Sequence, residues 1–161
     1  MTVSYFDRQA LAALGPKVRS ALEISNTQYG WLVSAFSIAY LVGSPLAGAW
    51  IDRVGARRGL LLAVSMWTLV AGLHAAVPNF AALFALRIGL GLTESPSFPG
   101  AAQTVQRALP KDQRSRGFGV LFMGSSIGAL LAPLAATALE KRFGFRVAFL
   151  VTAIAGLSWI P

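Results

Sequence analysis

The chain has 161 residues, of which 55 % are apolar and only 12 % are Asp, Glu, Lys or Arg. This charged fraction is about half that of a typical soluble domain, and the mean hydropathy is +0.62. The apolar content excludes intrinsic disorder, and the absence of cysteine excludes a disulfide scaffold and thiolate chemistry. The net charge of +8 fits either nucleic acid or an anionic membrane surface, so the positions of the charges must decide.

Long runs without a formal charge recur along the chain, at 24–51, 59–86, 117–139 and 147–161. A bilayer-spanning helix needs roughly 20 largely apolar residues, and the first three runs are long enough. The stretch between Arg87 and Arg107 carries one charge, on Glu94, and is also long enough. A turn signal at Pro78-Asn79 divides the second run. The sequence therefore predicts an all-α, polytopic membrane protein.

Six spans are predicted, at about 1–22, 27–51, 59–77, 80–106, 114–138 and 145–161. The first is the least clear, because Asp7, Arg8, Lys17 and Arg19 lie in it. Hydropathy alone leaves a soluble amphipathic helix as an open alternative for that segment. His74 is near the outer end of a predicted span, where we expect it at the membrane interface.

Small residues recur every four positions in the fifth span, at Gly124, Gly128, Ala132 and Ala136. Such a face allows two helix backbones to approach closely in lipid. Prolines inside the spans bend helices and free backbone carbonyls. They are Pro45, Pro96, Pro99 and Pro133.

The loops after the 27–51 and 80–106 spans are richer in Lys and Arg than the alternate connections. Basic short loops face the cytoplasm, so the N-terminus is also expected there if residues 1–22 form a span. The positive charge is then a topology signal. The basic residues are not interleaved with aromatic residues that could stack on bases, so no nucleic-acid partner is expected.

The loop after the 27–51 span has the pattern G-x-x-x-D-R-x-G-x-R-R, which resembles the corresponding loop of the major facilitator superfamily. Its fixed positions are Gly48, Asp52, Arg53, Gly55, Arg57 and Arg58. A purely topogenic basic loop would explain the arginines but not Gly48, Asp52 and Gly55. The resemblance implies a cytoplasmic gating motif. Asp52 is expected to meet the positive end of a neighbouring helix or an arginine.

Arg87 and Glu94 are seven residues apart, which places them on the same helix face but about 10 Å apart along the axis. Each is therefore expected to meet a partner from another helix. A glutamate in the middle of a span is costly and indicates a functional site by default. A structural buried ion pair is the alternative. Burial away from charges favours the protonated carboxyl, so Glu94 could carry a proton.

Three segments together resemble one branch of the superfamily, the anion:cation symporters. They are Tyr5-Phe-Asp-Arg-Gln-Ala-Leu11, Gly91-Leu-Thr-Glu-Ser-Pro-Ser-Phe-Pro99 and Phe143-Gly-Phe-Arg-Val-Ala-Phe149. This branch includes bacterial hexuronate, galactonate and glucarate transporters. The resemblance runs through the whole chain, in order and with the expected spacing.

The resemblance also implies roles for individual residues. Two carboxylates, on Asp7 and Glu94, would take part in proton coupling, and Arg87 would be the charge partner of Glu94. The residues implied to bind the substrate are Arg8, Tyr5, Tyr40 and Ser125. No metal or other cofactor is implied, because the proton is the coupling ion.

The implied function is proton-coupled symport of a sugar acid or small carboxylate, by alternating access, in a bacterial inner membrane. Members of the superfamily have twelve helices, so the chain is expected to be their N-terminal six-helix half, with its first and last helices truncated. Such a half is expected to be inactive without the C-terminal half. Two alternatives stay open: an exchanger or uniporter of the same superfamily, and a non-transporting six-helix membrane module. An enzyme is not expected, since no catalytic set of residues is present.

Overall fold

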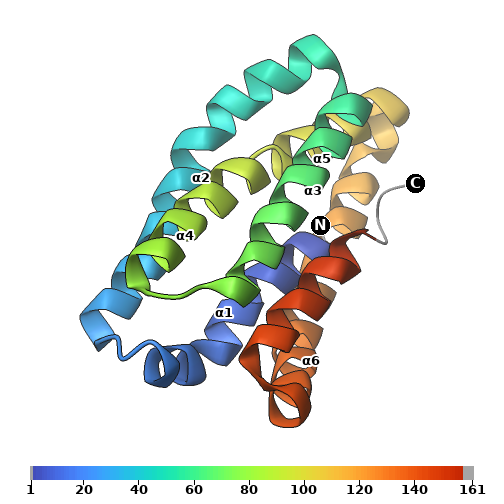
Figure 1. Cartoon of the computed structure of the whole chain (residues 1–161). Helices are drawn as coiled ribbons and strands as arrows, with labels where there is room; N and C mark the ends of the chain where they lie inside the picture. Colours follow the sequence, from blue (N-terminus) through green and yellow to red (C-terminus); the bar gives the residue numbers. More distant parts are fainter. Residues whose placement is uncertain (1, 158–161) are drawn as a thin grey trace.

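The computed structural model describes residues 2–157, except for the side chains of residues 3, 6, 7, 10 and 155–157. Within this part of the chain all regular structure is helical (Figure 1), as the sequence predicts. The α-helices are α1 (Thr2–Ala21), α2 (Asn26–Val54), α3 (Ala56–Leu73), α4 (Phe80–Glu94), α5 (Ser97–Ala108) and α6 (Arg114–Leu157). Two short 3-10 helices, η1 (His74–Ala76) and η2 (Lys111–Gln113), complete the set.

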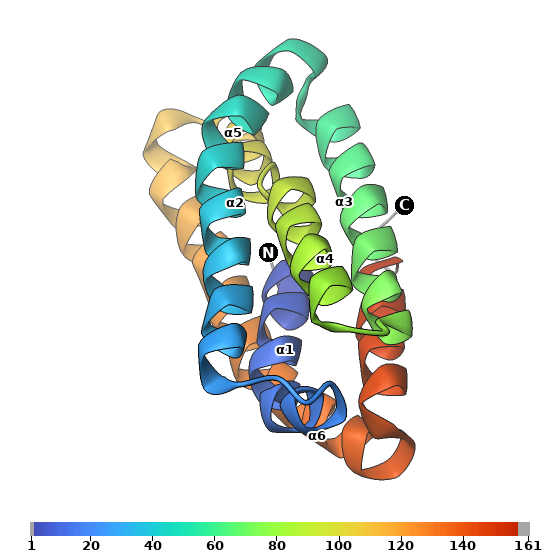
Figure 2. The same ribbon diagram turned by 60° about the vertical axis from the view of Figure 1, so that its left-hand side comes forward.

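The helices form one bundle in which α4 lies between α2 and α3 (Figure 2). Helix α1 packs mainly against α6. Local signals set the ends of the helices: Ser25 and Gln28 form a capping box at the start of α2. The turn predicted at Pro78-Asn79 is confirmed, since the Asn79 side chain accepts a hydrogen bond from the Ala82 backbone N–H and caps α4.

The predicted span at 80–106 is divided into two helices, because α4 ends at Glu94 and α5 begins at Ser97. Pro96 has no N–H to continue the α4 ladder to the Leu92 carbonyl. The Ser95 hydroxyl donates to that carbonyl instead, at 2.8 Å. The consequence for function is that Glu94 lies at the C-terminal end of a helix and next to a break.

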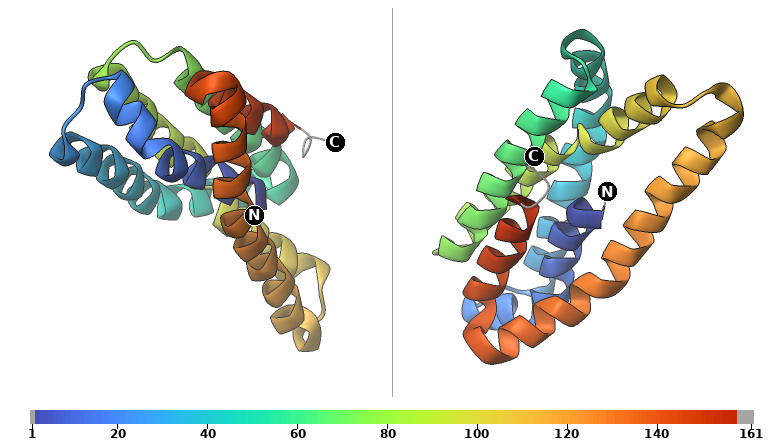
Figure 3. Two further views of the ribbon diagram at one scale, coloured as in Figure 1. Left: turned by 90° about the horizontal axis from the view of Figure 1, so that it is seen from below. Right: turned by 90° about the vertical axis from the view of Figure 1, so that its right-hand side faces the viewer.

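The predicted spans at 114–138 and 145–161 are joined in the single element α6, which changes direction at Gly144. Gly144 has a φ of 82°, a conformation that other residues rarely adopt. The right-hand view in Figure 3 shows α6 descending from residue 114 and its last part returning upward. Residues 158–161 of the predicted span lie outside the described residues.

Helix α1 packs within the bundle, although it is not among the described helices that are long and apolar enough to cross a membrane. Its apolar face is buried, with Leu11, Leu14 and Val18 at most 1 % exposed. A Cβ added at Gly128 of α6 would collide with the Thr2 backbone of α1, and one added at Gly124 would lie 3.0 Å from the Thr2 hydroxyl oxygen. The small-residue face predicted on the fifth span therefore receives α1.

The outside of the bundle is strongly apolar. Large side chains such as Leu41 (72 % exposed) and Leu46 (69 %) point outward. Among the described residues, three helical segments are long and apolar enough to cross a membrane: Asn26–Val54, Ala56–Ala76 and Lys111–Ile154. An exposed apolar surface of this extent needs lipid around it.

The contact between α2 and α4 provides a stability test at Gly91. A Cβ added there would lie 2.5 Å from the Phe36 carbonyl oxygen and 2.9 Å from the Ala39 Cβ. We expect Gly91→Ala to destabilise the detergent-purified protein by about 1–3 kcal/mol through overpacking. The measurement is its thermal unfolding.

The matched control is Gly89→Ala on the same helix, where an added Cβ meets Val70 at an ordinary 3.7 Å. Both variants gain the same helix propensity, so their difference isolates the packing term. Equal unfolding temperatures for the two variants would contradict the close approach of α2 and α4.

Candidate functional site

A buried ion pair joins α1 to the end of α4. The Arg8 Nε lies 2.8 Å from Glu94 Oε1, and the same oxygen accepts a hydrogen bond from the Ser4 hydroxyl. Arg8 is thus the partner from another helix that the spacing of Glu94 predicts. Since the C-terminal end of a helix carries partial negative charge, the Glu94 carboxylate needs this cation for its stability.

The two members of the pair differ in access. The Arg8 side chain is 21 % exposed, whereas the Glu94 side chain is 0 % exposed. The second carboxylate oxygen, Glu94 Oε2, is buried and has no hydrogen-bond partner among the described side chains. The cation is therefore partly accessible, whereas the carboxylate is enclosed in the protein.

Aromatic rings surround the Arg8 guanidinium. Its central carbon is 4.2 Å from the centroid of the Tyr40 ring and 5.2 Å from that of Tyr5. The Phe36 ring is 5.3 Å away and is also 4.8 Å from the Arg87 guanidinium. Each distance is within the range of cation–π attraction. The aromatic residues of α1 and α2 thus hold Arg8 in place, and Phe36 lies between two cations.

The structure brings together most of the site residues predicted from the sequence, namely Tyr5, Arg8, Tyr40, Arg87 and Glu94. Asp7 is in α1, but its side chain lies outside the described residues. Ser125 is buried on α6, where its hydroxyl donates to the Leu121 carbonyl of its own helix at 3.2 Å. No described contact joins Ser125 to the Arg8–Glu94 pair.

Two site residues, Ser4 and Phe36, were missed by the sequence analysis. Each had a detectable signal, because each lies four residues before a predicted site residue on the same helix. Ser4 precedes Arg8 by one turn, and Phe36 precedes Tyr40 by one turn. Including the residue one helical turn before each predicted site residue would have identified both.

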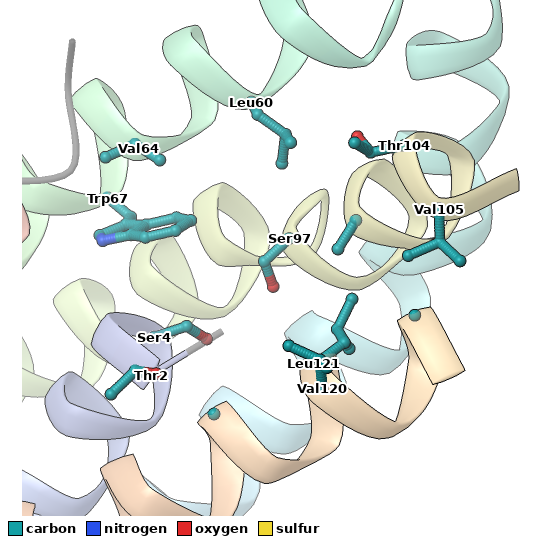
Figure 4. Close-up of a pocket in the computed structure, with 13 residues that line it drawn as sticks. Thr2, Ser4, Leu60, Val64, Trp67, Ser97, Thr104, Val105, Val120 and Leu121 are labelled. Carbon is teal, nitrogen blue, oxygen red and sulfur yellow. The ribbon is translucent and has the colours of Figure 1, made fainter. Parts of the chain in front are cut away.

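A cavity of about 430 Å³ lies beside the first turn of α1, between α3, α5 and α6 (Figure 4). The side chains of Ser4, Trp67 and Ser97 point toward it. Most of its lining is apolar, and Ser4 links it to Glu94. No group of three or more His, Cys, Asp or Glu residues that could hold a metal is found among the described residues.

The two glycines of the motif have different positions at the connection between α2 and α3. Gly55 joins the two helices with a φ of 84°, and Gly48 lies on the face of α2 that meets Pro99 of α5. The Asp52 carboxylate accepts a 2.6 Å hydrogen bond from the Gln103 side-chain amide. Its partner is therefore a neutral residue of α5, and not the helix end or arginine that we expected.

The arginines of the motif flank that loop. Arg53 is in the last turn of α2, and Arg57 and Arg58 are in the first turn of α3, all exposed. His74 also departs from expectation, because it is only 2 % exposed and is packed inside the bundle.

Comparison with known proteins agrees with this geometry. The family model described as "Major Facilitator Superfamily" matches residues 1–161. The chain belongs to this superfamily. Its resemblance to sugar-acid transporters of the superfamily is confirmed by curated relatives.

Three of these relatives cover nearly the whole chain. A hexuronate transporter of Bacillus subtilis is 32 % identical over 98 % of this chain and 37 % of its own length. A galacturonate transporter of Dickeya chrysanthemi is 29 % identical over 98 % of this chain and 46 % of its own length. A probable galactarate/D-glucarate transporter of Bacillus subtilis is 33 % identical over 97 % of this chain and 36 % of its own length. The chain thus spans less than half the length of each.

The solved structures support the fold. The inward-facing, unoccupied form of a bacterial homolog to the human lysosomal transporter Spinster matches with a TM-score of 0.89 and 20 % identity. The match covers 98 % of this chain and 38 % of that one. The superfamily membership and the long apolar helices make the chain a multi-pass integral membrane protein, and the solved structure shares its helical arrangement.

The Arg8–Glu94 pair yields a stability prediction. Arg8→Met leaves the Glu94 carboxylate buried without its cation, which we expect to destabilise the protein by about 3 kcal/mol or more at neutral pH. The double variant Arg8→Met/Glu94→Gln removes both charges and should recover most of this loss. Thermal unfolding of the purified protein measures both effects.

The control is Lys17→Met, which breaks the ion pair of Lys17 and Glu140 at 3.4 Å. Since Lys17 is 63 % exposed, we expect that loss to stay below about 1 kcal/mol. A double variant no more stable than Arg8→Met would show that the buried pair does not account for the loss.

Proposed function

We propose that the chain is the N-terminal half of a proton-coupled symporter that carries a small organic anion across a bacterial inner membrane. The single observation that carries this proposal is the pairing of a partly exposed cation, Arg8, with a fully buried carboxylate, Glu94. The anion class is supported by the hexuronate, galacturonate and galactarate/D-glucarate transporters among the relatives. The anion is moved without chemical change, so the protein is not an enzyme.

Coupling follows from competition for Arg8. While Glu94 is ionised, its carboxylate is paired with the Arg8 guanidinium and weakens the attraction of Arg8 for an external anion. A proton on Glu94 removes this competitor, and the substrate carboxylate takes its place on Arg8. The buried oxygen Oε2, which has no described hydrogen-bond partner, offers a place for that proton.

Reorientation is favoured in the loaded, neutralised state. Moving an unpaired charge through the low-dielectric centre of the membrane is expensive, whereas a protonated carboxyl and a paired guanidinium are not. Loss of the proton on the opposite side restores the Arg8–Glu94 pair and expels the substrate. The two halves of such a transporter rock around a site near the membrane midplane.

The other predicted residues support this cycle. Asp7 is the second proton-coupling carboxylate. Glu94 pairs directly with Arg8, so Arg87, implied by the resemblance to be its charge partner, acts as a second cation of the site beside Phe36. The substrate hydroxyl groups are bound by Tyr5 and Tyr40, with Ser125 of α6 as a further substrate-binding residue.

The α2–α3 motif forms a cytoplasmic gate, in which the bond between Asp52 and Gln103 is made and broken as the halves rock. The N-terminus and the arginine-rich loops lie in the cytoplasm.

The test supplies the missing half from a relative. The chain is co-expressed with the C-terminal half of the Bacillus subtilis hexuronate transporter, and co-purification confirms that the halves assemble. We expect uptake of labelled galacturonate that needs both halves and that stops when a protonophore collapses the pH gradient. Glu94→Gln mimics the protonated carboxyl and cannot release a proton. It should reduce gradient-driven uptake about 100-fold while leaving counterflow exchange intact.

The matched control is Glu140→Gln, a carboxylate of α6 outside the site, which should keep normal uptake. Uptake that ignores the pH gradient, with Glu94→Gln harmless, would indicate a uniporter or an exchanger. Assembled halves that take up no anion, with Arg8→Ala and Glu94→Ala tolerated, would indicate a non-transporting membrane module.

A further inference from the structure

His74 is a buried polar residue with no place in the cycle proposed above. It lies in η1 at the end of α3, beside the last part of α6 (Figure 2), and is 2 % exposed. Its ring packs on Phe149, with the centroids 5.7 Å apart. Its Nδ1 lies 2.8 Å from the Val70 carbonyl oxygen. Because a carbonyl only accepts, Nδ1 carries the hydrogen and the neutral ring presents Nε2 as an acceptor.

The acceptor Nε2 is buried and has no hydrogen-bond partner among the described residues. A buried acceptor without a partner costs about 1–3 kcal/mol. His74 also lines a cavity of about 10 Å³ between α3, α4 and α6. That volume is close to the minimum that holds one water molecule.

Arg87 is the donor that faces the same cavity. The other lining residues are apolar, except for Thr152, whose hydroxyl donates to the Phe149 carbonyl at 2.9 Å. Arg87 is 4 % exposed and has five N–H donors, so a contact with His74 is compatible with its other contacts.

We propose that His74 is a positioning residue for Arg87, with Nε2 accepting a hydrogen bond from the guanidinium through one water molecule in this cavity. The bond fixes the guanidinium against Phe36, whose ring also contacts Arg8. The outer end of α3 thereby sets the orientation of the second cation at the anion site. The effect on transport rests on the proposed function, whereas the contact itself does not.

The contact is tested without transport. His74 is the single histidine of the chain, so labelling with [15N]histidine gives the nitrogen resonances of one imidazole. In the detergent-purified chain we expect the Nδ1–H tautomer with a hydrogen-bonded Nε2. Arg87→Met and the more conservative Arg87→Lys should both shift the Nε2 resonance. Trp67→Phe, at a buried residue of α3 that does not line this cavity, should leave it unchanged.

An Nε2 resonance that ignores both Arg87 variants, or an Nε2–H tautomer in the parent chain, overturns the proposal. Because two variants of different severity are used, misfolding of one of them does not block the test. A positive result combined with no uptake by any assembled transporter would reject the proposed function and leave the contact standing.

The positioning role is tested in the assembled transporter. His74→Phe keeps the ring packing but removes the acceptor, and we expect the KM for galacturonate to rise about tenfold with little change in the maximal rate. His74→Gln restores an acceptor near Nε2 and should recover most of the affinity. On an Arg87→Lys background, His74→Phe should add no further effect. A fall in the maximal rate alone, or fully additive effects, would indicate a merely structural histidine.

Discussion

The contact between Arg8 and Glu94 is the constraint on which the rest of the structure depends. A carboxylate at the C-terminal end of a buried helix faces the partial negative charge of free carbonyls and has little water around it. A cation or a proton must therefore accompany it. The cation comes from α1, which is 86 residues away in the sequence. Gly124 and Gly128 contribute by letting the start of α1 approach α6 closely.

A second cation close to the first creates its own difficulty. Arg8 and Arg87 carry like charges that repel each other. The Phe36 ring between them presents a π-face to each guanidinium, which offsets part of the repulsion without adding a competing negative charge. An acidic residue in that position would neutralise the cations and weaken the attraction for substrate. Aromatic side chains keep the site positive and ordered.

The sequence predicts the fold well because the signals are local. Charge-free runs locate the long apolar helices α2, α3 and α6, and the loop glycine Gly55 has the positive φ that only glycine adopts readily. Local patterns cannot decide whether a proline bends a helix or ends it. At Pro96 the Ser95 hydroxyl takes over the freed carbonyl, and the helix ends. The Gln103 partner of Asp52 and the burial of His74 depend on packing between distant segments, which spacing along one helix does not contain.

The break at Pro96 makes α5 a helix separate from α4. This twelve-residue rod is about 18 Å long. The N-terminal end of α5 follows Glu94 after a short break. Toward its C-terminal end, the Gln103 amide donates a hydrogen bond to Asp52 of α2. A shift of the Glu94 carboxylate would either bend the chain at Pro96 or move α5. A movement of α5 would strain the hydrogen bond between Gln103 and Asp52, which links the charge state of Glu94 to the geometry of the α2–α3 loop.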